Sequence, residues 1–338
     1  MFFNQSSTNT CQCSLTGETY QVAQIPLGFG AFLLNIVIVS AILSKEELRY
    51  RKDTILIGGL ALADSAEGLA TLAAGVYRTL SVVSGRACRC VSKLHCMLLP
   101  HSLIWRWSEF GTGFMLLAIS IDRWIVVTKP LYHLSLTYRY ALKMVAAVYL
   151  FGILNLAVAF YHPIAHRDVV IAAYCSSSST VANVYYQYSK YTCSGASCLS
   201  VTIFALVVHR YRLHKRNRIA QMAKDAGLMN EAQMSHARKV EQRLTVTLAI
   251  SSLCTLLLDS IPRAYGIYIT FNPEANFLGG YKNYVFQLTK VNAMANFVIY
   301  SLRHKDIKQA VMGLVGKKKK VSKPLNNQLK YENRKHMK

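Results

Sequence analysis

The sequence predicts an all-α integral membrane protein, a bundle of seven transmembrane helices followed by a short amphipathic eighth helix. Three observations support this fold class: a composition poor in charge, seven continuous apolar runs, and a strong bias of positive charge toward alternate connecting segments. Only 16% of the 338 residues are charged and 52% are hydrophobic, whereas soluble globular domains carry about 25% charged residues.

Composition also excludes several classes of protein. The formal net charge of +23 suits either a nucleic-acid binder or a membrane protein. In a nucleic-acid binder the bases would lie on a folded polar surface, whereas here they punctuate apolar runs. The hydrophobic content excludes a disordered chain, and nine cysteines are too few for a small disulfide scaffold. We therefore expect membrane lipids, and no nucleic acid, as partners.

Seven segments have the length of about 20 apolar residues that a helix needs to cross the bilayer core. They are roughly Ile25–Leu43, Thr54–Tyr77, Met97–Ile121, Ala141–Tyr161, Tyr191–His209, Leu244–Ile269 and Asn283–Leu302. Continuous runs favour helices, because the strands of a barrel would alternate over about ten residues. The third run is interrupted by Arg106 and Glu109, the fifth is short, and the seventh contains Lys290.

Positive charge predicts the orientation. With the N-terminus outside, the inward segments carry 29 Lys and Arg residues, and the outward segments 77–96, 162–190 and 263–282 carry 8. Basic loops stay in the cytoplasm, so we expect a multi-pass plasma-membrane protein with an extracellular N-terminus and a cytoplasmic C-terminus. The expected organisation is an extracellular N-terminus (1–24), a seven-helix domain (25–302), an amphipathic helix (303–315) and a basic cytoplasmic tail (316–338).

The cysteines agree with this topology. Six fall on the outward side, where an oxidising compartment favours disulfides. They are Cys11, Cys13, Cys88, Cys90, Cys96 and Cys175. The other three fall inside spans and are expected to pack as small apolar side chains. On the same outward side, Asn4 begins an Asn-Gln-Ser sequon, which predicts glycosylation.

Polar residues inside the spans carry a family resemblance. The landmarks are Asn35 in the first span, Leu60-Ala61-Leu62-Ala63-Asp64 in the second, Ile121-Asp122-Arg123-Trp124 closing the third, Pro262 in the sixth, and Asn296-Phe297-Val298-Ile299-Tyr300 ending the seventh. In these spans and this order they resemble the rhodopsin-like (class A) G-protein-coupled receptors. The resemblance covers residues 25–315 and implies a receptor that passes an extracellular signal to a heterotrimeric G protein.

The resemblance implies a role for each landmark. Asp64, Asn35 and Asn296 would share a buried hydrogen-bond network, with waters or a sodium ion at Asp64, that rearranges on activation. Asp122 would hold Arg123 until a G protein presents an acceptor.

Two further landmarks concern the sixth and seventh helices. Pro262 would kink the sixth helix and give it a pivot, and Tyr300 would swing into the opened cytoplasmic cavity. The family's disulfide would join Cys96 to Cys175, with Cys88 or Cys90 as competing partners; the pairing of the other outward cysteines stays open.

The chain also departs from the family pattern. Trp124 replaces the usual Tyr, Phe297 replaces the Pro of Asn-Pro-x-x-Tyr, and Ser260 stands where an aromatic is usual two residues before Pro262. The fifth span has no proline and the fourth no tryptophan. Such divergence, with Arg-Lys-Asp before the second span and Gly-Val-Tyr-Arg ending it, is most similar to the nematode serpentine chemoreceptors.

A ligand, small molecule or peptide, is expected in the outer half of the bundle. The candidate pocket residues are Trp105, Arg106, Glu109, Asp259 and Lys290. Arg106 and Glu109 stand one turn apart and could pair with each other. Trp105 occupies the position of the Asp in amine receptors, which disfavours a biogenic amine. No cofactor is expected.

Lys290 leaves one alternative open. It lies six residues before Asn296, the spacing of the retinal-bearing lysine in opsins. Lys290 could equally neutralise Glu67, Asp259 or Glu109, which needs no chromophore. Absence of a visible absorbance band after reconstitution with 11-cis-retinal would exclude an opsin.

After the seventh span, the segment 306–315 places apolar residues on one helical face. They are Ile307, Ala310, Val311, Leu314 and Val315. This predicts an interfacial amphipathic helix, and the lysine run 317–320 suits anionic inner-leaflet lipids.

Two other functions compete with a chemosensory receptor. An ion-coupled transporter could use the buried charges as an ion path, but transporters often show internal repeats and we find none. An enzyme would need paired catalytic groups, and the histidines are scattered without metal-ligand spacing. We therefore expect a receptor and not an enzyme.

Overall fold

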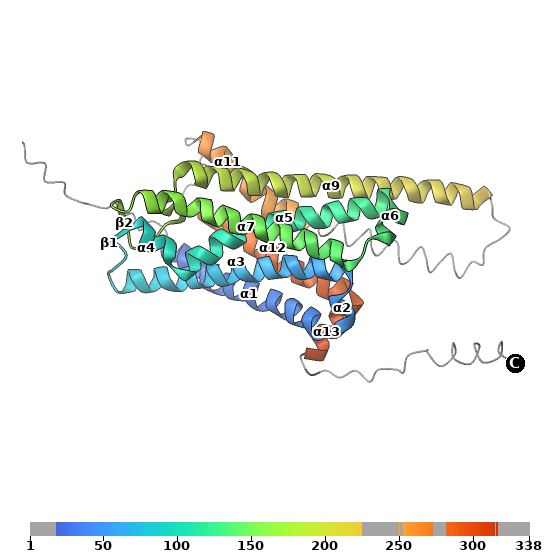
Figure 1. The fold of residues 1–338 in the computed structure, drawn as a ribbon, viewed down its shortest axis with the longest axis horizontal. Helices are drawn as coiled ribbons and strands as arrows, with labels where there is room; N and C mark the ends of the chain where they lie inside the picture. Colours follow the sequence, from blue (N-terminus) through green and yellow to red (C-terminus); the bar gives the residue numbers. More distant parts are fainter. Residues whose placement is uncertain (1–17, 225–249, 251–252, 273–281, 315, 317–338) are drawn as a thin grey trace, which may run out of the picture.

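The computed structural model describes residues 18–224, 250, 253–272, 282–314 and 316. In this part of the chain, long helices run side by side along the long axis of the molecule (Figure 1). They are α1 (Glu18–Ser44), α3 (Lys52–Val83), α5 (Pro100–Thr128), α7 (Tyr138–Ala165), α9 (Asn183–Lys224), the π-helical turn η1 (Leu256–Ser260) continuing into α11 (Ile261–Phe271), and α12 (Lys282–Arg303). Together they confirm the predicted all-α bundle.

Short elements connect the long helices. These are α2 (Glu46–Arg49), α4 (Lys93–Leu98), α6 (Pro130–Ser135), α8 (Ser177–Thr180), and α13 (Lys305–Leu314) after α12. Strands β1 (Cys90–Ser92) and β2 (Val170–Ala172) were not predicted; they pair antiparallel, with Val91 opposite Ile171. We call the end of the bundle that carries this hairpin the disulfide end, and the opposite end the α13 end.

Among the described residues, five helices are long and apolar enough to cross a membrane: α1, α3, α5, α7 and α9. The η1–α11 segment and α12 complete the bundle, and part of the predicted sixth span lies outside the described residues. Helix α7 shows the lipid-facing pattern most clearly, because Leu150, Ile153, Leu154 and Val158 are all more than half exposed on the isolated chain. Lipid tails would cover this apolar face.

Some predicted boundaries were wrong. The fifth span was placed at Tyr191–His209, but α9 begins at Asn183 and ends at Lys224. The third helix begins at Pro100 rather than Met97, because proline suits the first helical turn. Helix α3 continues to Val83, so Arg78, counted among the outward loop bases, is helical and buried.

Helices α1 and α3 cross in close contact at two glycines. A Cβ atom at Gly28 would lie 2.4 Å from the Leu72 nitrogen, and one at Gly68 would lie 2.5 Å from the Phe32 nitrogen. Only glycine lets the two backbones approach this closely, a device common in membrane helices. The crossing fixes the position of the α3 residues that form the functional site.

Helix α13 lies against α1 at its own end of the bundle (Figure 1). Ile307 and Ala310 are buried in a cluster with Ile38 and Ala41 of α1, and Val311 packs against it. On the predicted apolar face, Ile307, Ala310 and Val311 are therefore the residues that pack against α1. Leu314, predicted on the same face, is exposed, and Val315 and the lysine run lie outside the described residues.

Candidate functional site

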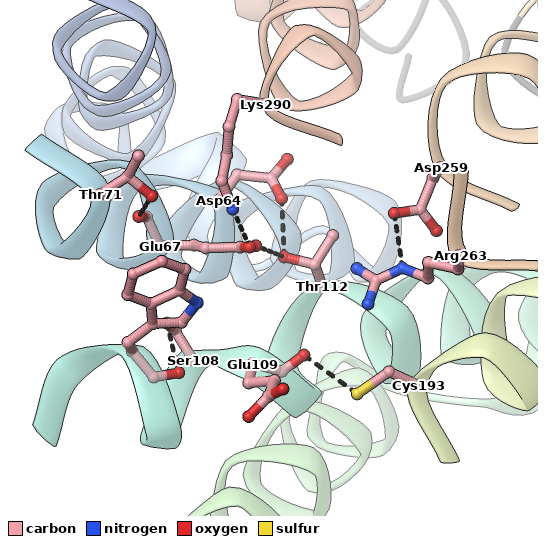
Figure 2. Close-up of polar contacts among 11 residues, drawn as sticks. Asp64, Glu67, Thr71, Ser108, Glu109, Thr112, Cys193, Asp259, Arg263 and Lys290 are labelled. Carbon is pink, nitrogen blue, oxygen red and sulfur yellow. Dashed lines mark hydrogen bonds and ion pairs between the residues drawn. The ribbon is translucent and has the colours of Figure 1, made fainter. Parts of the chain in front are cut away.

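Three helices meet at Asp64, which is fully buried in α3. Its carboxylate accepts hydrogen bonds from the Thr112 hydroxyl of α5 at 2.9 Å and from the Asn296 amide of α12 at 3.1 Å. Thr112 also donates to Glu67 at 3.3 Å, so its hydroxyl lies between two carboxylates, as Figure 2 shows. A rearrangement of any one helix would alter these bonds.

Asn35, expected in the same network, has a different role. Its side-chain amide donates to the carbonyls of Ala31, at 2.9 Å, and Ala293, at 3.1 Å. Asn35 thus ties α1 to α12, and the described bonds do not join it to Asp64. These helix carbonyls satisfy the buried Asn35 amide, because no water in the bilayer core can do so.

Lys290 of α12 pairs with Glu67 of α3. Of the three partners that the sequence left open, the structure selects this one. The side chains are 6% and 13% exposed, respectively. The Lys290 ammonium also lies 5.8 Å from the centre of the Trp105 ring, and the Arg78 guanidinium lies 5.8 Å from the same ring. Trp105 therefore contacts two cations from two helices.

Arg106 and Glu109 form the second buried pair, within α5. Arg106 Nη1 donates to Glu109 at 2.8 Å, and its Nη2 donates to the Ser177 carbonyl at 2.9 Å. Glu109 accepts a further bond from the Ser189 hydroxyl of α9 at 3.1 Å. The pair thus connects α5 both to α9 and to the loop that carries α8.

The third buried pair joins Asp259 in η1 to Arg263 in α11. Arg263 Nε donates to Asp259 at 2.9 Å, and the Ser197 hydroxyl of α9 donates to the other carboxylate oxygen at 2.5 Å. Sequence counting had placed Arg263 with the outward loop bases, which was wrong: its side chain is only 17% exposed. Pro262, the predicted pivot, lies next to Arg263 and directly after η1.

At the α13 end, Asp122 contacts two basic side chains. Its carboxylate lies 3.0 Å from His133 Nε2 of α6 and 3.5 Å from Arg123 Nη2. Asp122 is buried, and Arg123 is 21% exposed. The Lys52 ammonium donates to the His133 carbonyl at 2.5 Å, which ties α6 to α3. Tyr300, which ends the landmark motif of α12, packs half-buried against apolar clusters beside this group.

Close to it, His304 lies between α12 and α13. Burial is the main cause that lowers the pKa of His304; the charge of Asp53 opposes this and that of Arg123 adds to it. These effects together disfavour the charged form of the imidazole beside Arg123.

The predicted disulfide is present at the opposite end. Cys96 and Cys175 are bonded, with their Cα atoms 5.4 Å apart, which confirms this pairing over the competing cysteines. Cys88 and Cys90 are disulfide-bonded as well. Cys11, Cys13 and the glycosylation candidate Asn4 lie outside the described residues, so the pairing of the remaining outward cysteines stays open.

The bonded loop is held over the bundle. Tyr77 donates to the Ala173 carbonyl at 2.9 Å, and Arg78 donates to the Cys175 carbonyl at 3.1 Å. Gln21 of α1 donates to the Tyr174 hydroxyl at 2.7 Å. The loop is therefore tied to α1 and α3, and one of its donors, Arg78, also lies over the Trp105 ring.

Sequence reasoning missed several site residues. There was no signal for Thr112, Ser197 or His133, because isolated hydroxyl and imidazole side chains are common in any helix. Arg78 was noted only as the end of the Gly-Val-Tyr-Arg motif and as an outward base, not as a site residue. Arg263 did give a signal, since it stands four residues after Asp259, the spacing at which side chains meet on a helix.

The family model that matches the chain describes a 7 transmembrane receptor (rhodopsin family), over residues 34–300. A comparison with curated proteins finds no match. The family match includes all three buried pairs, the disulfide and the group around Asp122. Since it covers most of the chain, the chain belongs to the rhodopsin family of seven-transmembrane receptors.

Proposed function

We propose that this receptor converts an extracellular chemical signal into activation of a heterotrimeric G protein. The observation that carries the proposal is the weak ion pairing of the Arg123 guanidinium. Among the described residues, its ion pair is the 3.5 Å approach to Asp122, which His133 approaches more closely, at 3.0 Å, while the charge of Asp53 acts on Arg123 from farther away. A guanidinium held this weakly is available to a partner that offers a better acceptor.

A partner surface lies beside Arg123. Helix α6 projects Leu131 and Leu134, which are 82% and 76% exposed. Apolar side chains so exposed at a helix end, next to basic segments, suit a protein partner with an apolar pocket and acidic groups. Arg210 and Arg212 in α9 belong to the basic third inner segment; the remaining bases of that segment lie beyond the described side chains.

The disulfide end is proposed to face outward and the α13 end the cytoplasm. The disulfides support this orientation because they persist in oxidising compartments. Of the eight bases counted as outward, Arg78 is buried and Arg263 is only 17% exposed and paired within the bundle. This leaves the proposed outer loops still less basic than the inner segments, as the positive-inside rule requires.

The ligand is proposed to bind beneath the bonded loop, near Trp105, Arg106, Glu109, Asp259 and Lys290. These residues come from α5, η1 and α12, so a ligand touching them would bias the relative positions of three elements. A chemosensory role is supported by the motif departures, notably Phe297 and Ser260, that set the chain apart from most of its family.

Asp64 is the proposed position for a sodium ion. The donors present there fit in kind, since a carboxylate and the Thr112 hydroxyl are oxygen ligands of the type that hard cations prefer. Lys290 already supplies a positive charge to the adjacent Glu67. A sodium ion would therefore interact mainly with Asp64, whose described partners are neutral.

The test compares basal nucleotide exchange on a panel of G proteins for the wild type, Arg123→Ala and Arg139→Ala. Arg139 is exposed at the start of α7 and serves as the matched control. We expect exchange that is lost in Arg123→Ala and kept in Arg139→Ala. Exchange equal in all three would refute the role of Arg123, and substrate-dependent flux without any exchange would identify a transporter instead.

A further inference from the structure

The sixth helix is irregular where its pivot is expected. Within η1 the Ile261 N–H donates to the Leu256 carbonyl, five residues back instead of four. Pro262 follows directly and has no N–H to donate. A π turn next to a proline leaves this stretch with less regular backbone bonding than the helices around it.

Asp259 lies inside this turn and is 1% exposed. Both of its oxygens are bonded: one accepts from Arg263 Nε at 2.9 Å and the other from the Ser197 hydroxyl at 2.5 Å. Figure 2 shows the Arg263 guanidinium turned toward Asp259. The two bonds differ in what they connect, because Arg263 belongs to the same helix as Asp259 and Ser197 belongs to α9.

Helix α9 is firmly held on its other side. A Cβ atom at Gly113 of α5 would lie 3.4 Å from the Cys193 carbonyl and 3.6 Å from the Ser197 hydroxyl, so α5 and α9 are in close contact at this level. Cys193 donates to the Glu109 carbonyl at 3.4 Å, and Ser200 bonds Ser120 of α5 at 2.7 Å. Any opening between α9 and η1 must therefore come from movement of η1 and α11.

We infer that the hydrogen bond from Ser197 to Asp259 is the contact that holds the sixth helix in its resting position and that breaks on activation. When η1 and α11 move, the Arg263–Asp259 pair travels with them and stays intact. The Ser197 bond crosses the interface and must be lost. This inference rests on the proposed function only for its link to G-protein coupling.

The test uses three variants. Ser197→Ala removes the donor, Ser197→Thr keeps a hydroxyl, and Ser200→Ala removes an equally buried hydroxyl one turn along α9 that bonds α5 instead of η1. Amide hydrogen exchange over residues 253–271 reports local opening without any G protein. Basal nucleotide exchange is measured in parallel on the same purified receptors.

We expect Ser197→Ala to exchange about tenfold faster over 253–271, the scale set by loss of a hydrogen bond to a charged group. Ser200→Ala and Ser197→Thr should stay near the wild type, and basal nucleotide exchange should rise in Ser197→Ala alone. Unchanged hydrogen exchange in Ser197→Ala, or an equal increase in Ser200→Ala, would overturn the inference. Faster hydrogen exchange with no nucleotide exchange in any receptor would uphold the contact and count against the proposed coupling.

Discussion

The Glu67–Lys290 pair offers the sharpest test of the structure. Lys290→Met keeps the length and the apolar stem of the side chain but removes its charge. Glu67 would then be buried, at 13% exposure, with Thr112 as its remaining described side-chain donor, at 3.3 Å. Removing one partner of a buried ion pair costs about 3–5 kcal/mol, because the other charge stays uncompensated.

The double variant Glu67→Gln/Lys290→Met removes both charges together. Replacing a whole buried pair by neutral groups is often close to neutral in stability, so the double variant should recover most of the loss. At roughly 2 °C per kcal/mol for a large domain, Lys290→Met should lower Tm by roughly 6–10 °C. The double variant should lie within a few degrees of the wild type.

Thermal unfolding of the purified receptor in detergent measures this directly, with a thiol-reactive dye that reports exposure of the buried, free Cys193. The cycle of wild type, two single variants and the double variant isolates the coupling between the two side chains. Additive losses in the double variant would mean that the two residues do not interact. A Lys290→Met receptor as stable as the wild type would show that the ammonium is solvated rather than paired.

Three other variants test separate parts of the structure. Gly68→Ala should destabilise the receptor by about 1–3 kcal/mol, because a Cβ atom there meets backbone of α1. The control Gly195→Ala, in open space on α9, should be neutral or stabilising in the same thermal assay. Equal behaviour of the two variants would contradict the α1–α3 crossing. Cys175→Ser should cost about 4 kcal/mol, since the bond closes a loop with a sequence separation of 79, while Cys198→Ser, at an exposed free thiol, should leave Tm unchanged. Asp122→Asn keeps a polar partner for His133 but removes the charge facing Arg123, so basal nucleotide exchange should rise several-fold; no rise would refute the restraint on Arg123. Asp306→Asn breaks only an exposed ion pair with Arg51 and should change stability by less than about 1 kcal/mol.

The described helices follow the sequence closely where one physical requirement dominates. A run of about 20 apolar residues can satisfy its backbone in a bilayer only as a helix, so the spans were readable without a structure. The ends of α9 could not be predicted in this way, because Asn183 and Lys224 lie beyond the apolar run. There water can hydrogen-bond the backbone of a loop, so a helix is not required.

Some site residues could likewise be predicted from the sequence, whereas their partners could not. Sequence order singled out Asp64, Asp122, Arg123 and Asn296, because a polar residue inside a span requires a reason. It could not choose a partner for Lys290, since that choice depends on how α12 is rotated against α3. It also misplaced Arg263, because position along the chain put this residue in the outward segment 263–282, whereas its side chain turns back to Asp259 in the bundle.

The sequence by itself determined the helical bundle, the family landmarks and the expected topology, because hydrophobic length and charge placement act locally along the chain. Only the tertiary structure decided which side chains meet across helices: Lys290 with Glu67, and Asp259 with Ser197. These pairings depend on helix rotation, on the glycine crossing of α1 with α3, and on the irregular turn before Pro262. Each of these arises from packing between helices, and spacing along one helix does not encode it.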